Sequence, residues 1–70
     1  MIKMNDFVRH KTTGISGVVI SIYTIGTYDD IKHADWYIDV RVETGNRNIQ
    51  YETPMKNWVV VTPNDDQNID

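Results

Sequence analysis

The 70-residue chain has no cysteine and no long apolar run. The absence of cysteine excludes disulfide bonds, thiolate nucleophiles and cysteine-based zinc sites. No segment approaches the roughly 20 apolar residues of a membrane-spanning helix, so we expect no membrane association. No apolar stretch of secretory-signal length follows the first residues, which predicts a cytoplasmic protein. Core packing then has to hold the fold, because no covalent link is available.

Strong positive charge is also missing, since the net charge is -3. Proteins that bind nucleic acid mainly through phosphate contacts carry a basic surface, and this total does not indicate one. The charges are nevertheless unevenly distributed. Lys3, Arg9 and Lys11 lie near the start, while acidic residues mark the middle and the end. A basic face can therefore exist on an acidic protein.

Alternation of apolar and polar residues is clearest at 16–25 and 36–43, and predicts two half-buried strands. The side chains expected to face inward are Val18, Ile20 and Ile22 in the first and Trp36, Ile38, Val40 and Val42 in the second. Trp36 opens its strand beside the polar segment 26–35, so we expect it to be partly exposed. Shorter strands are predicted at 6–10, 48–52 and 58–62, and Trp58 is expected in the core.

Glycine and proline residues mark the connections between these strands. A glycine-containing turn at 44–47 predicts a hairpin. Because Pro54 cannot donate to a sheet, we expect residues 53–57 to form a turn or one 3₁₀ turn. The polar segment 26–35 predicts a long exposed loop.

Together these elements predict an all-β fold, a five-stranded barrel with one 3₁₀ turn before the last strand. The run Asn5 to Lys11, followed by Gly14, Gly17 and Val18, resembles the opening of SH3-like barrels of the KOW and Tudor kind. The residues that fall where such barrels place their later turns and strands are Gly45, Tyr51, Pro54 and Trp58. The resemblance implies one barrel domain at 1–63. We expect the acidic tail at 64–70 to be mobile.

A second resemblance concerns the type II dihydrofolate reductases, SH3-like barrels that build one pore from four chains. The segments at 7–11, 22–23 and 49–51 are similar to their layout, and Gln50 matches a glutamine that binds NADPH and dihydrofolate in that family. His10 stands where the family has a lysine, and residues 51–54 differ from its Ile-Tyr-Pro segment. The resemblance implies shared architecture, while the departures fall on functional residues, so reductase activity is a distant alternative.

No set of residues predicts catalysis or metal binding. His10 and His33 are far apart, Asp35 with His33 is the only local pair, and the pair Asp29 and Asp30 is interpreted as loop charge. We therefore expect no catalytic residue, no metal ion and no cofactor.

Aromatic and basic residues predict a binding surface instead. Tyr23, Tyr37 and Arg41 are expected on the outward faces of neighbouring strands, an arrangement that holds single-stranded nucleic acid in small barrels. Arg9 and Lys11 would extend this surface.

A protein partner is the first hypothesis. The exposed aromatics, among them Tyr28 and Trp36, would lie with the 26–35 loop and the 53–57 turn near one end of the barrel. This mixed aromatic and acidic surface suits a basic protein. We predict a non-enzymatic interaction module, similar to small accessory proteins of phages and mobile elements. Single-stranded or duplex nucleic acid is the alternative partner, and homo-oligomers are compatible with both.

Overall fold

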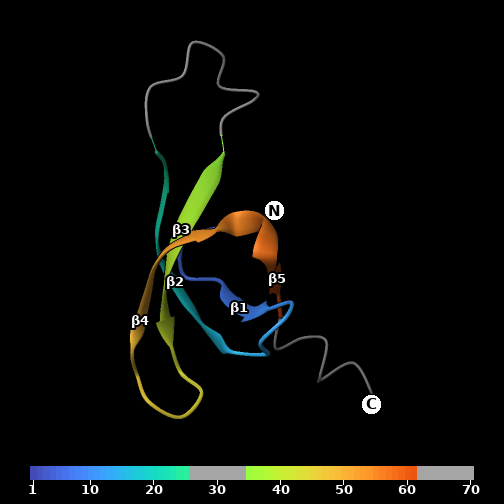
Figure 1. Cartoon of the computed structure of the whole chain (residues 1–70), viewed down its shortest axis with the longest axis vertical. Helices are drawn as coiled ribbons and strands as arrows, with labels where there is room; N and C mark the ends of the chain where they lie inside the picture. The colour runs from blue at the N-terminus through green and yellow to red at the C-terminus, as the bar shows by residue number, and fades with distance from the viewer. Residues whose placement is uncertain (26–34, 62–70) are drawn as a thin grey trace.

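The computed structural model describes residues 1–25 and 35–61, and it confirms the all-β prediction. Five antiparallel strands form one sheet (Figure 1), with a single 3₁₀ turn before the last strand. The elements are β1 (Phe7–His10), β2 (Ser16–Thr24), β3 (Trp36–Val42), β4 (Ile49–Pro54), η2 (Met55–Asn57) and β5 (Trp58–Val60). Within the two described ranges, no helix has the length and apolar character needed to cross a membrane.

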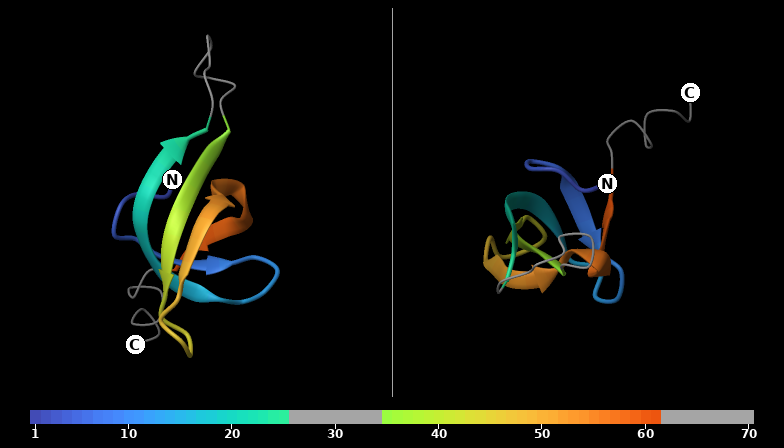
Figure 2. Two further views of the ribbon diagram at one scale, coloured as in Figure 1. Left: turned by 60° about the vertical axis from the view of Figure 1, so that its left-hand side comes forward. Right: turned by 90° about the horizontal axis from the view of Figure 1, so that it is seen from above.

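The strands follow the order β4-β3-β2-β1-β5, so β4 and β5 lie at the two ends of the sheet. The sheet curls but does not close, because no strand pairing joins β4 to β5. Figure 2 shows η2 connecting the two ends of the curled sheet. A side-chain hydrogen bond adds to this link, since Trp58 Nε1 donates to Thr53 Oγ1 at 2.8 Å. The predicted barrel is therefore an open one.

The core fills the inside of the curl. Val8, Val19, Ile38 and Val40 are fully buried, and Trp58 and Ile2 pack against them. Burial of each aliphatic side chain is worth about 1.5–3 kcal/mol. Four such side chains make a small core, which is ordinary for a chain of this length. The prediction that Trp58 is a core residue is confirmed.

The predicted inward set of β2 is wrong for Val18 and Ile20, which are only half-buried. Val19 is the fully buried residue and pairs with Val40. The next partners are Ser21 and Asp39, so Ile20 is an extra residue in β2. Such a β-bulge reverses which residues face the core, and it returns Ile22 to the inner face, where it packs against the core.

The inward set predicted for β3 is confirmed at Ile38, Val40 and Val42. Trp36, on the same side of the alternation but expected to be partly exposed, is 42% exposed. Trp36 opens the strand opposite Thr24, beyond the reach of the core. The predicted end of β4 at residue 52 is wrong, because pairing continues through Thr53 and Pro54. Proline is tolerated there because β4 is an edge strand. Residues 26–34 of the predicted loop and the 64–70 tail lie outside the described residues.

Gly17 lies on β2 between β1 and β3. It faces Val8 on β1 and Val42 on β3, and it is buried. A Cβ atom at this position would overlap the carbonyl oxygen of Arg41 and would lie 2.9 Å from Val40 Cγ1. Backbone atoms of a central strand cannot move aside cheaply, so the β2–β3 approach requires glycine.

We predict that Gly17→Ala lowers the free energy of unfolding by about 2–3 kcal/mol, through overpacking. Gly14→Ala is the matched control, because Gly14 has φ +77° and nothing within 4 Å of an added Cβ. Its cost comes from backbone conformation alone and should be about 1 kcal/mol. Urea unfolding of both variants measures the difference. A loss at Gly17 no larger than that at Gly14 would contradict the close approach.

Candidate functional site

The structure brings two of the predicted binding residues into contact. Tyr23 on β2 and Tyr37 on β3 are register partners. Their rings stack with centroids 6.5 Å apart and planes inclined by 24°. Both side chains are half-buried, and the pair lies on the outer face of the sheet. The sequence-based prediction that these tyrosines lie on neighbouring strands therefore matches their placement.

Asp39 organises this part of the outer face, and sequence analysis did not single it out. Tyr23 Oη donates to Asp39 Oδ1 at 2.7 Å, and the backbone N–H of Glu52 donates to the same oxygen at 2.9 Å. Glu52 has a positive φ of 51°. It belongs to a second bulge, since β3 pairs Ile38 with Thr53 but Val40 with Gln50. The carboxylate thus satisfies a backbone donor that the bulge removes from the sheet ladder.

The tyrosine environment changes the acidity of the Tyr23 phenol. Burial, followed by the hydrogen bond to Asp39 and the charge of that carboxylate, raises the pKa of Tyr23 to about 12. All of these effects favour the neutral phenol, because an anion beside Asp39 would be both poorly solvated and repelled. Tyr23 therefore acts as a hydrogen-bond donor that fixes the outer face.

Arg41 faces the same side of β3 but is engaged elsewhere. Its Nε donates to Glu43 Oε2 at 2.8 Å, and Arg47 Nε lies 3.8 Å from Glu43 Oε1. The hydrogen bond from Arg41 is the main cause that lowers the pKa of Glu43. Asp39 stands between Arg41 and Tyr37 along the strand. A carboxylate thus separates the predicted cation from the stacked rings.

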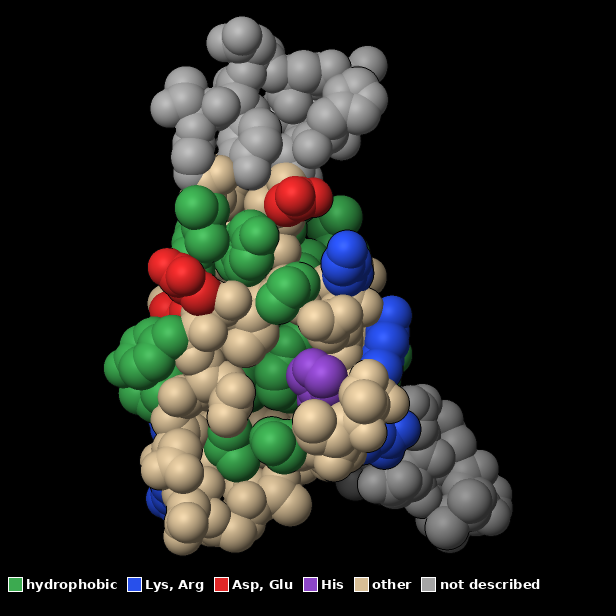
Figure 3. Space-filling view, in the orientation of Figure 1, with side chains coloured by type: hydrophobic (Ala, Val, Ile, Leu, Met, Phe, Trp, Pro, Cys, Tyr) green, Lys and Arg blue, Asp and Glu red, His purple; other side chains and the backbone are tan. Residues whose placement is uncertain are grey.

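The structure separates Arg9 and Lys11 from the tyrosine pair. Arg9 pairs with Ser16, whereas Tyr23 is seven residues further along β2, roughly 23 Å at the rise of a strand. The N–H of Lys11 donates to the carbonyl of Asn57, the residue that follows Lys56. Arg9 on β1, Lys11 just after it and Lys56 on η2 are all exposed, and we call these three residues the cationic edge. Figure 3 shows most visible cations on one side of the molecule.

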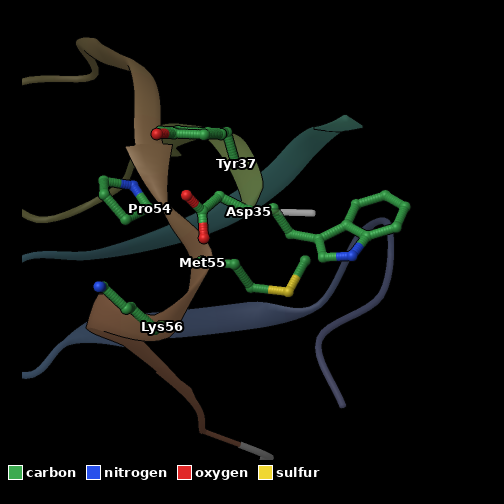
Figure 4. A pocket seen from close by; sticks show the side chains of 6 residues that line it. Asp35, Tyr37, Pro54, Met55 and Lys56 are labelled. Atoms are coloured by element: carbon green, nitrogen blue, oxygen red, sulfur yellow. The ribbon is translucent and has the colours of Figure 1, made fainter. Parts of the chain in front are cut away.

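A pocket of about 350 Å³ opens between the start of β3 and the 3₁₀ turn. The residues that line it are Asp35, Trp36, Tyr37, Pro54, Met55 and Lys56. Figure 4 shows the Asp35 carboxylate between the Tyr37 ring and the Met55 side chain, with the Lys56 amine at the outer side. Apolar walls with a few charged groups, at a volume of this size, are typical of a site for a small ligand or a side chain.

This pocket contains two residues that the sequence singled out, Trp36 and Tyr37, and it includes part of the predicted 53–57 turn. Asp35, Met55 and Lys56 were not predicted as site residues, because nothing local marks two segments about 17 positions apart as neighbours. Tyr28, another predicted binding residue, lies outside the described residues.

The two residues that carry the resemblance to type II dihydrofolate reductases lie on different parts of the sheet. His10 ends β1, where its Nδ1 accepts N–H bonds from Thr12 and Thr13, both at 3.2 Å. Its ring packs edge-on against Trp58 at 4.9 Å. Gln50 is on β4, with β3 and β2 between the two strands. His10 therefore supports a turn and the core.

In residues 1–25 and 35–61, no three His, Asp or Glu side chains come together as a metal site. Comparison of the chain with models of known protein families, with curated proteins and with solved structures finds no match. The candidate site is thus defined by its own geometry, which is the pocket at the β3–η2 junction.

We predict that the Tyr23 hydroxyl loses its stabilising effect in alkali. Between pH 10 and 12 the unfolded chain releases this proton while the folded chain retains it, so stability falls as pH rises. Below pH 10 the stabilisation is fully present. Urea midpoints of the wild type and Tyr23→Phe, compared from pH 8 upward, should therefore converge above about pH 10. A difference that stays constant would show that the phenol titrates normally.

Removal of the Asp39 carboxylate should be costly, because both the Glu52 N–H and the Tyr23 hydroxyl lose their acceptor. Asp39→Ala should lower the free energy of unfolding by about 1–3 kcal/mol. Asp39→Asn keeps an oxygen acceptor and should lose clearly less. Urea unfolding compares the two variants, and equal losses would indicate that charge rather than acceptor geometry matters.

Proposed function

We propose that the protein is a non-enzymatic interaction module that binds a protein partner at the β3–η2 pocket. The observation that carries this proposal is the pocket itself, in which Trp36, Tyr37 and Met55 form apolar walls beside the Asp35 carboxylate. Trp36 is 42% exposed, so a large aromatic surface is available to a ligand. Aromatic residues and methionine are enriched where proteins meet, because they bury much area and adapt to the partner.

The net charge of the whole chain, -3, favours a basic segment of the partner. The pocket itself holds both the Asp35 carboxylate and, at its outer side, the Lys56 amine. A volume of about 350 Å³ accommodates one or two side chains rather than a folded surface. An exposed peptide segment with an apolar or long cationic side chain fits both features, since its stem can pack on the rings.

Nucleic acid is the second candidate, supported by the cationic edge of Arg9, Lys11 and Lys56. Binding of single strands combines phosphate contacts with base stacking on aromatic rings. Here Arg9 and Lys11 lie far from the stacked tyrosines, and of the cationic edge only Lys56 lines the pocket that contains Tyr37. Asp39 also carries negative charge next to the rings. The arrangement supports this function less than it supports binding of a peptide.

Two further parts of the proposal come from the sequence. The open five-stranded sheet with its 3₁₀ turn is compatible with membership among SH3-like barrels of the KOW or Tudor kind. The second part is a cytoplasmic accessory role, similar to that of small phage proteins that bind host machinery, for which the β3–η2 pocket offers a place to bind a partner.

The pocket hypothesis predicts that peptides selected from a random display library on the wild type depend on Trp36. Trp36→Ala should weaken their binding about tenfold or more, as expected for an aromatic anchor. Tyr51→Ala is the matched control, since Tyr51 is 67% exposed and lies outside the pocket. Fluorescence anisotropy measures the affinities, and circular dichroism verifies folding. Equal binding to all three proteins, or no selected peptide, would refute the hypothesis.

The nucleic-acid alternative has its own test. Labelled single strands titrated at low salt should then bind, with affinity falling steeply as salt rises. Lys11→Ala and Lys56→Ala should each weaken binding, while Arg47→Ala, an exposed cation near Glu43 outside the cationic edge, should not. Absence of binding at low salt would remove nucleic acid as a partner.

A further inference from the structure

The outer edge of β4 has backbone groups that no described strand pairs. β4 is the terminal strand of the sheet, and only β3 lies beside it. Val42 N–H donates to the carbonyl of Asn48, and Val40 pairs with Gln50, so Asn48 and Gln50 direct their backbone groups toward β3. By the alternation of antiparallel strands, the N–H and C=O of Ile49 and Tyr51 point away from the sheet.

The side chains at this edge are apolar and unusually open. Ile49 is 39% exposed and Tyr51 is 67% exposed, and both lie on the same face because they are two positions apart. Natural edge strands are commonly protected by charge, bulges or proline. β4 has such protection only beyond this point, at the bulged Glu52 and at Pro54. The stretch from Ile49 to Tyr51 is thus open for pairing.

We propose that β4 pairs antiparallel with β4 of a second copy of this chain, about a two-fold axis at Gln50. Continuous antiparallel pairing of identical strands requires one residue to face itself, because any other register would place paired side chains on opposite faces. With Gln50 on the axis, Ile49 of each copy faces Tyr51 of the other. These two positions are also the ones with outward backbone groups, so they form the hydrogen-bonded pairs.

Charge at the ends of this pairing is complementary. Just beyond the ladder, Asn48 lies near the bulged Glu52 of the second copy, and Arg47, whose side chain is 78% exposed, is the next residue along. A cation of each copy therefore lies near an anion of the other at both ends. No two residues of like charge face each other in this register. The bulge at Glu52 confines the ladder to three residues per copy, which makes the pairing weak and dependent on concentration.

The chain offers a direct test because it has no native cysteine. Gln50 faces itself at a non-hydrogen-bonded position, where the Cα atoms of antiparallel strands are about 4.5 Å apart, within the range of a disulfide. In a glutathione buffer, Gln50→Cys should form a covalent dimer at least about tenfold faster than Asn48→Cys. In the proposed register the two residues at position 48 are four positions apart along the paired strands. The difference should vanish in urea. Equal rates under native conditions would overturn the proposal.

Sedimentation equilibrium of the unmodified protein provides the second measurement. The average mass should rise with concentration, and Tyr51→Glu should reduce this rise, because it places a carboxylate opposite Ile49 of each copy. Since Tyr51 is exposed, this variant should retain the fold, which circular dichroism verifies. A protein that stays monomeric up to millimolar concentration, or a dimer unaffected by Tyr51→Glu, would contradict pairing through β4.

Discussion

Two bulges that meet one strand at the same point shape this molecule. In β2, the extra residue Ile20 lies between the partner of Val40 and the partner of Asp39. In β4, the extra residue lies opposite Asp39 itself. Bulges sharpen the twist of a sheet, so two of them on either side of β3 bend a short sheet around its core. The Asp39 carboxylate stabilises the second bulge, because it accepts a hydrogen bond from the Glu52 N–H. The curl, and the position of every element beyond it, follow from this arrangement.

The pocket depends on the same bend. After its bulge, β4 continues through Thr53 to Pro54, which pairs with Tyr37, and η2 then turns beside the start of β3. Tyr37 has two roles as a result, since one ring stacks on Tyr23 and also lines the pocket. The hydrogen bond from Tyr23 to Asp39 therefore supports the wall of the site without touching a ligand. The outer-face contacts around Asp39 and the pocket are thus adjacent, and they share Tyr37.

Sequence patterns predicted the strands, the hairpin and the 3₁₀ turn, because period-two alternation, glycine and proline act locally. They could not predict the β2 bulge. Val18, Val19 and Ile20 are all apolar, so the sequence does not show which of them faces the core. Trp36 and Tyr37 were found through exposure of aromatic residues. Asp39 was missed because its role arises from partners 13 and 16 residues away. Contacts of this kind exist only once the sheet has formed.

The two tryptophans of the chain have opposite environments. Trp58 is 4% exposed and bonded to Thr53, whereas Trp36 is 42% exposed at the pocket. Indole emission shifts with solvation, so the buried ring reports on whether the two ends of the sheet stay joined, and the open ring would report on occupancy of the proposed binding pocket. A soluble quencher reaches only the second. One spectrum can thus distinguish loss of fold from ligand uptake without any added label.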